Sequence, residues 1–232
     1  MTLVCNGTQD TIRETLKTDI RHHANTNKTG TFTEASFSFA DTAGFRALGV
    51  ALEDNSGVIV DNYSLRGNSG MILSRLDSAR CRELNEIRPY DLVVLQYGLN
   101  IVSDSVLQYG WYAKRMEEAV RHVRVCFPDA DILMLGVSDR SRQVDGTFET
   151  MPAVLALLHA QRQAARRSGV AFWNVFGAMG GENSMVRFVE NNWASKDYTH
   201  LSFRGGKEIA SALLKAILLE KEFYDEADKV AR

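Results

Sequence analysis

Asp197 and His200 are the residues of this chain best suited to do chemistry, and they lie in the sequence Asp-Tyr-Thr-His. This spacing can aim the carboxylate at one imidazole nitrogen and leave the other nitrogen free to act as a base. His200 would take a proton from a hydroxyl nucleophile and return it to the leaving group, while Asp197 holds the correct tautomer. The alternative is a capping aspartate and a surface histidine that precede a helix.

Two earlier segments offer groups that could stabilise a developing negative charge. Gly98 and Asn100 follow the apolar run 92–95, so the glycine permits a sharp turn and the asparagine amide can donate a hydrogen bond. Gly67, in the sequence Arg-Gly-Asn-Ser-Gly, would add a backbone N–H that no β-carbon shields. The alternative is a pair of strand-end turns, where glycine and asparagine are common.

These three segments, in this order, resemble three of the four sequence blocks of the SGNH hydrolases, also called GDSL esterases, over roughly residues 57–218. The resemblance implies that His200 is the catalytic base, that Asp197 orients it, and that Gly67, Gly98 and Asn100 form the oxyanion site. It implies a serine esterase that forms an acyl-enzyme intermediate without a metal or cofactor. The expected substrates are acyl esters, above all acetyl groups on carbohydrate, and a periplasmic or secreted location would suit them.

The fourth block, a Gly-Asp-Ser sequence that carries the nucleophile in this family, is missing before Gly67. The sequence Asn-Gly-Thr-Gln, which contains Thr8, is the segment most similar to this block. The resemblance therefore implies a nucleophile upstream of this chain, at the end of a central strand, and no esterase activity of the chain by itself. Residues 1–56, another copy, or chain outside this sequence would fill that strand position, which leaves self-association open. The alternative function is a catalytically inactive SGNH-fold domain that binds carbohydrate or acts as a scaffold.

Three further residues are candidates for the substrate pocket. Met179 and Trp193 lie on the long stretch that leads to Asp197, where a structural loop is an equal alternative. Arg140 follows the apolar run 132–137, and an ion pair with Asp139 is the alternative there.

Composition excludes several other classes of function. The formal net charge is -2 and the lysine and arginine residues are scattered, so the sequence lacks the clustered positive charge that nucleic-acid binding requires. No apolar run is long enough to span a bilayer. Neither the 3 cysteines nor the 5 histidines have the spacing of a metal site, so we expect no metal and no cofactor.

The elements that must position these residues change in character near residue 57. Before it, short runs such as 3–5 and 35–39 have the pattern of antiparallel strands, and residues 1–56 resemble the tail of a β-sandwich that some carbohydrate esterases of the family contain. After it, apolar runs at 57–60, 92–95, 132–137 and 170–173 alternate with stretches of helical period at 72–79, 116–123, 154–165 and 209–217.

This alternation predicts an α/β domain at 57–232, a three-layer α/β/α sandwich of the flavodoxin-like kind with a mostly parallel sheet. Ligands bind at the carboxyl ends of the strands in such sheets. Gly67, Asn100 and His200 each follow an expected strand. We therefore expect them to converge at one edge of the sheet.

Overall fold

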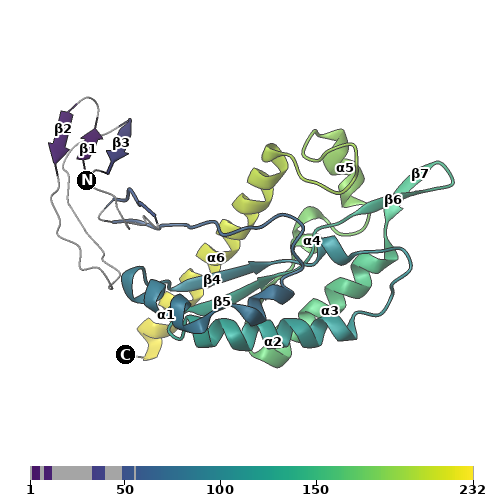
Figure 1. Ribbon diagram of the computed structural model, residues 1–232. Coiled ribbons are helices and arrows are strands. Elements are labelled where there is room, and N and C mark those ends of the chain that lie inside the picture. Colours follow the sequence, from purple (N-terminus) through teal and green to yellow (C-terminus); the bar gives the residue numbers. More distant parts are fainter. Residues whose placement is uncertain (1, 6–7, 12–32, 40–48, 55, 232) are drawn as a thin grey trace. The chain divides into compact units, whose positions relative to one another are not determined.

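The computed structural model describes residues 2–5, 8–11, 33–39, 49–54 and 56–231, which form two compact units, 1–63 and 64–232 (Figure 1). In the first unit three strands form an antiparallel sheet with the order β2-β1-β3: β1 (Thr2–Cys5), β2 (Thr8–Thr11) and β3 (Ala35–Ser38). The β-structure that the sequence predicts at 3–5 and 35–39 is present.

The second unit contains a parallel sheet with the order β4-β5-β8: β4 (Leu92–Gln96), β5 (Asp131–Leu135) and β8 (Ala171–Trp173). An antiparallel hairpin, β6 (Ser141–Val144) and β7 (Thr147–Thr150), follows β5. The helices are η1 (Met71–Arg75), α1 (Ser78–Ile87), η2 (Leu99–Ile101), α2 (Gly110–Cys126), α3 (Pro152–Ser168), α4 (Val175–Met179), α5 (Ser184–Glu190) and α6 (Phe203–Ala231).

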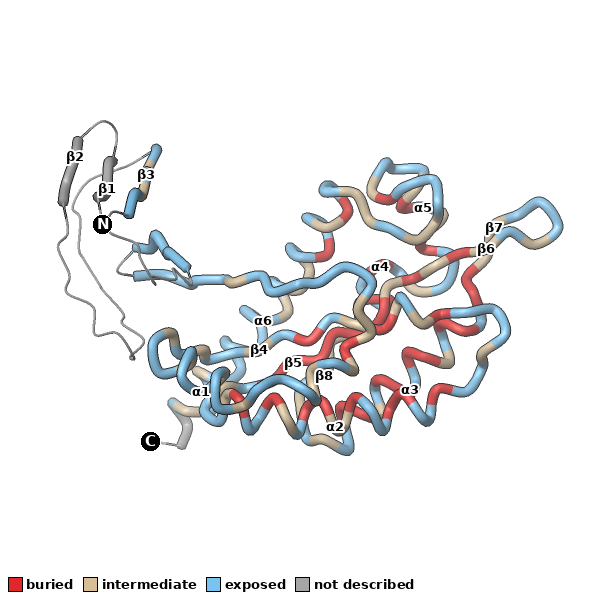
Figure 2. Tube along the Cα trace, viewed as in Figure 1, coloured by how far each residue is buried: buried red, intermediate tan, exposed pale blue. Residues whose placement is uncertain are grey.

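Helices α2 and α3 cover one face of the sheet (Figures 1 and 2). Their apolar stripes recur at helical spacing, so Met116 and Val120 of α2 and Val154 and Leu157 of α3 are buried together with Leu95 of β4. Local sequence also sets the ends of α3, which has a proline in its first turn and ends at a glycine in the left-handed conformation.

A second apolar cluster lies on the opposite face. Leu133 and Leu135 of β5 pack there with Val175 of α4, Met185 of α5 and Ile209 of α6. Successive residues of β5 therefore point into different clusters, as expected for a strand that is covered on both faces. The predicted α/β fold, with a parallel sheet flanked by helices, is confirmed.

The expected strand at 57–60 is wrong. These residues form no strand, and the side chains of Val58 and Val60 are 92% and 84% exposed. An apolar run becomes a strand only where a neighbouring strand can pair with its backbone, and among the described strands β4 pairs with β5 alone. β4 is therefore an edge strand in the described chain, and its Val94 side chain is 45% exposed.

The single helical stretch expected at 72–79 is divided in two. The helix η1 ends at Arg75, and α1 begins at Ser78 after the N-cap residue Asp77. The Asp77 side chain accepts hydrogen bonds from the backbone N–H groups of Ala79 and Arg80. This capping favours a new helix start over a continuous helix.

Candidate active site

Asp197 and His200 form a hydrogen-bonded pair in a tight turn before α6. The imidazole Nδ1 lies 2.7 Å from Asp197 Oδ2. The other carboxylate oxygen, Oδ1, accepts the backbone N–H groups of Thr199 and His200, each at 3.0 Å. These bonds fix the carboxylate against the turn, so the contact inferred from the spacing is present.

The pair leaves one nitrogen of His200 available. Because the carboxylate accepts the proton on Nδ1, the imidazole presents Nε2 as its basic nitrogen, and Nε2 has no hydrogen-bond partner among the described residues. The imidazole side chain is 73% exposed, so an incoming group can reach it. Partial burial raises the pKa of Asp197, but hydrogen bonds from the backbone and side chain of His200 and from the Thr199 backbone outweigh it and leave the pKa below its ordinary value.

The glycine-rich segment and the Gly98–Asn100 segment lie against each other. The Asn100 amide donates to the Asn68 carbonyl at 2.9 Å. One of its two N–H donors remains for a ligand. Gly70 has φ +85°, and a β-carbon there would lie 2.7 Å from Cγ of Tyr97, so only glycine allows this approach. Gly67 itself is exposed, with φ +71°.

Gly98 turns the chain at the end of β4 with a φ of +115°, which L side chains rarely adopt. A β-carbon at this position would lie 2.7 Å from Nε2 of Gln161. Gln161, only 1% exposed on α3, donates to the Tyr97 carbonyl at 2.7 Å and accepts the Val137 N–H at 2.9 Å. This one side chain therefore joins the carboxyl ends of β4 and β5.

Two consecutive residues after β5 connect the Asn100 loop to the His200 turn. Arg140 Nη1 donates to the Val102 carbonyl at 3.2 Å, two residues beyond Asn100. The backbone N–H of Ser141 donates to the Tyr198 carbonyl at 3.1 Å, two residues before His200. Both loops are thus bound to one short segment at the carboxyl edge of the sheet.

The pocket candidates have different surroundings. Met179 is 5% exposed in the second apolar cluster, where its sulfur accepts the Asp139 N–H at 3.3 Å, so its contacts are those of a core residue. Trp193 is half-buried and packs edge-on against Phe188 with ring centroids 5.2 Å apart. Arg140 lies next to the Asn100 loop, where its guanidinium donates to the Val102 carbonyl.

The ion pair considered for Asp139 and Arg140 is not among the contacts of the described chain. The buried carboxylate of Asp139 instead accepts three hydrogen bonds, from Thr150 Oγ1 at 2.8 Å, Met185 N at 2.8 Å and Ser184 Oγ at 3.3 Å. It thereby ties the hairpin and the start of α5 to the end of β5.

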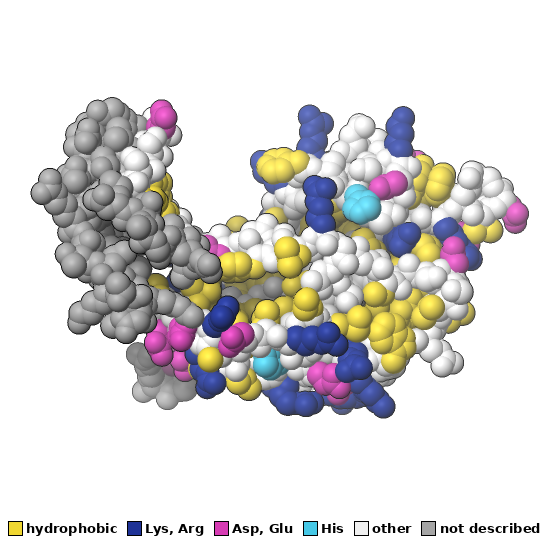
Figure 3. All heavy atoms as spheres, in the orientation of Figure 1, with side chains coloured by type: hydrophobic (Ala, Val, Ile, Leu, Met, Phe, Trp, Pro, Cys, Tyr) yellow, Lys and Arg dark blue, Asp and Glu magenta, His cyan; other side chains and the backbone are white. Residues whose placement is uncertain are grey.

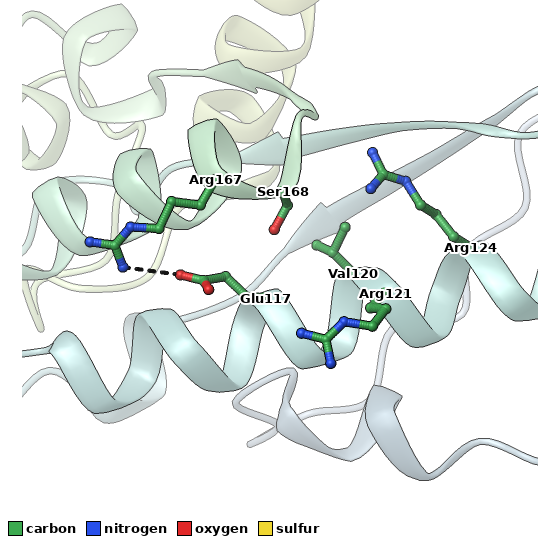
Figure 4. Close-up of a pocket in the computed structure, with 6 residues that line it drawn as sticks. All are labelled: Glu117, Val120, Arg121, Arg124, Arg167 and Ser168. Carbon is green, nitrogen blue, oxygen red and sulfur yellow. Dashed lines mark hydrogen bonds and ion pairs between the residues drawn. The ribbon is translucent and has the colours of Figure 1, made fainter.

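A hollow of about 170 Å³ lies elsewhere, between α2 and α3 (Figure 4). Its lining residues are Glu117, Val120, Arg121, Arg124, Arg167 and Ser168. Two of its arginines already have partners, since Arg167 pairs with Glu117 at 3.2 Å and Arg124 donates to the Gly169 carbonyl. No residue of the candidate site contributes to this hollow.

Basic and acidic side chains are interspersed on the visible face of the second unit (Figure 3). The described part of the chain holds no group of three or more histidine, cysteine, aspartate or glutamate residues that could bind a metal ion. Among the described residues, no helix combines the length and apolarity that a membrane span requires.

Sequence reasoning missed Gln161, the three hydrogen bonds that the Asp139 carboxylate accepts, and the role of the Asn68 carbonyl. Their partners lie far away in the chain, so no local sequence pattern indicates these contacts. A buried-face glutamine on an otherwise apolar stripe of α3 was the available signal for Gln161.

No family model matches the chain, and no curated protein matches it. Among solved structures, a peptidoglycan O-acetylesterase is similar, with a TM-score of 0.57 and 28% identity over 68% of this chain. The match covers 45% of that protein, so this chain spans less than half of its length.

Two other solved structures are more distant. One is an α/β hydrolase enzyme from the metagenome of Lake Arreo, Spain, with a TM-score of 0.44 and 20% identity over 65% of this chain and 68% of that one. The other is a carbohydrate acetylesterase from Sinorhizobium meliloti, with a TM-score of 0.41 and 20% identity over 68% and 72%. The likeness to the peptidoglycan O-acetylesterase, together with the three sequence blocks, is consistent with an SGNH/GDSL-type esterase family.

Proposed function

We propose that this chain provides the base and the oxyanion-stabilising part of an SGNH-type serine esterase that removes acetyl groups from carbohydrate. The observation that carries the proposal is the pair of Asp197 and His200, whose Nδ1 to Oδ2 distance of 2.7 Å leaves Nε2 exposed as a base. The similarity to a peptidoglycan O-acetylesterase supports an O-acetylated carbohydrate as the substrate class. An exported location fits such a substrate.

In this proposal His200 Nε2 removes the proton of a serine hydroxyl as the oxygen attacks the acetyl carbonyl. The negative charge that develops on the carbonyl oxygen is stabilised by the second N–H of Asn100 and by the backbone N–H of Gly67. His200 then gives its proton to the sugar oxygen that leaves, and water releases the acetate by the reverse sequence. Asp197 stabilises the imidazolium while it carries the proton.

The serine belongs to chain outside these residues in our proposal, because residues 1–66 contain no Gly-Asp-Ser block. The 232-residue chain should therefore not react with a serine-directed phosphonate, whereas the natural protein that contains the missing block should react once per chain. Stoichiometric labelling of the 232-residue chain would show that one of its own hydroxyls is the nucleophile.

The test of the roles is acetate release from O-acetylated glycan by the natural protein. His200→Ala should lower kcat by about a hundred- to ten-thousandfold, and Asn100→Ala by about a hundred- to a thousandfold. His159→Ala is the matched control, since His159 is exposed on α3 and its hydrogen-bond partner is Gln163 of the same helix. Equal kcat values for the His200 and His159 variants would reject the assignment of the base.

The second candidate function is a carbohydrate-binding domain without catalysis, which would need no Gly-Asp-Ser block. It predicts that O-acetylated glycan binds the natural protein but is never hydrolysed. Calorimetry on the same substrates, followed by an assay for acetate, separates the two functions.

A further inference from the structure

Tyr198, the residue that follows Asp197 in the turn, has an unusual backbone conformation. Its φ is +53°, in the left-handed region that bulky residues rarely adopt. A residue stays in this conformation only where its surroundings hold it there. Because Tyr198 lies between Asp197 and His200, its backbone angles set how the carboxylate and the imidazole face each other.

The hairpin of β6 and β7 makes two contacts with Tyr198, whose own N–H donates within the turn to the Ser195 carbonyl at 3.0 Å. The ring of Phe148 stacks on the Tyr198 ring with centroids 3.5 Å apart and planes 8° from parallel. The backbone N–H of Ser141 donates to the Tyr198 carbonyl at 3.1 Å. The hairpin therefore contacts both the side chain and the backbone of Tyr198.

The hairpin is itself firmly bound to the domain. Thr150 Oγ1, at the end of β7, donates to the buried carboxylate of Asp139 at 2.8 Å and accepts the Asn183 N–H at 2.7 Å. The Thr150 N–H donates to Asn183 Oδ1 at 3.0 Å. These bonds fix the hairpin relative to β5 and α5, so it can act as a rigid support.

We propose that Phe148 is a positioning residue that holds the Asp197–His200 turn in its hydrogen-bonded geometry through its stack on Tyr198. Among the described residues, no hydrogen bond, ion pair or ring contact joins Phe148 to Asp197 or His200, and its ring contact is with Tyr198. Without its ring, Tyr198 can relax toward negative φ, and the carboxylate turns away from Nδ1. The consequence for catalysis rests on the proposed esterase function, whereas the consequence for the geometry of the turn does not.

The first measurement is NMR of the 232-residue chain. In the wild-type protein the Nδ1 proton of His200, bound to a carboxylate, should give a downfield resonance, and the carboxyl carbon of Asp197 should titrate with a pKa below 3.8. In Phe148→Ala the resonance should be lost and the pKa of Asp197 should rise toward 3.8. Phe148→Tyr, which keeps the ring, should retain both signals.

Thr147→Val is the matched control, because Thr147 is an exposed residue of the same strand and its side chain donates within the hairpin, to the Val144 carbonyl. It should leave both signals unchanged. If Phe148→Ala does not fold, Phe148→Leu keeps apolar bulk without the planar stack and takes its place. A folded variant without the ring that keeps the wild-type resonance and titration overturns the proposal.

The second measurement is turnover by the natural protein. Phe148→Ala should lower kcat by about ten- to a hundredfold with KM nearly unchanged, since it misplaces the base without removing a substrate contact. Phe148→Tyr should restore the rate. Loss of the NMR signals in the alanine variant of a protein that hydrolyses no ester would confirm the role of Phe148 in the turn and refute the esterase function alone. An unchanged kcat in an active enzyme would refute the positioning role.

Discussion

Replacing Gln161 with leucine tests whether one buried side chain holds the two strand ends at the candidate site together. Leucine has a similar size and is as compatible with a helix, so the change removes the amide with little change in packing. Gln161 is 1% exposed and makes two hydrogen bonds, one to the Tyr97 carbonyl and one from the Val137 N–H. The substitution leaves both backbone groups without their partner.

The cost follows from the burial of those two groups. A buried backbone group left unpaired costs about 1 to 3 kcal/mol. The hydrogen bond to Val137 is buried and the one to Tyr97 is partly buried, so the upper end of this cost range applies to the Val137 N–H only. We therefore expect Gln161→Leu to lower the free energy of unfolding by about 2 to 4 kcal/mol.

Urea unfolding followed by circular dichroism measures this change on the 232-residue chain, whatever its activity. Gln163→Leu on the same helix is the matched control, because Gln163 bonds only surface side chains, His159 and Arg167, and the change should stay within about 0.5 kcal/mol. If the two variants differ by less than about 0.5 kcal/mol, the inference that Gln161 joins β4 to β5 is refuted.

Two other predictions concern the glycine turn and the acid. Gly98→Ala should lower the free energy of unfolding by about 1 to 3 kcal/mol, because φ is +115° and the new β-carbon meets Gln161. Gly146 also has a positive φ, but a β-carbon there meets open space, so Gly146→Ala should lower the free energy of unfolding by less. Thermal unfolding of the two variants measures the difference. The lowered pKa of Asp197 means that its ionised form stabilises the fold above its unfolded pKa, near 3.8, and that this contribution is lost as pH falls through the lower folded pKa. The stability difference between wild type and Asp197→Asn should therefore shrink below pH 3.8, and a difference that does not change with pH there would contradict this.

The sequence by itself predicted those features whose cause is local. Asp197 and His200 lie three residues apart in one turn, so the spacing alone indicates that the carboxylate can reach the imidazole and the backbone N–H groups of the turn. Helices α2 and α3 follow from apolar residues at helical spacing, at 116–123 and 154–165. The parallel strands β4, β5 and β8 follow from short apolar runs between helices.

Only the tertiary structure decided the features that depend on a partner far away in the chain. The apolar run 57–60 has the composition of a strand, but a strand exists only where another backbone pairs with it, and no described strand does. Gln161 bonds a carbonyl 64 residues away. Phe148 stacks on Tyr198, and α3, β8, α4 and α5 lie between these two residues in the sequence. Such contacts arise when the chain folds back on itself, and neither periodicity nor spacing records which distant residues will then meet.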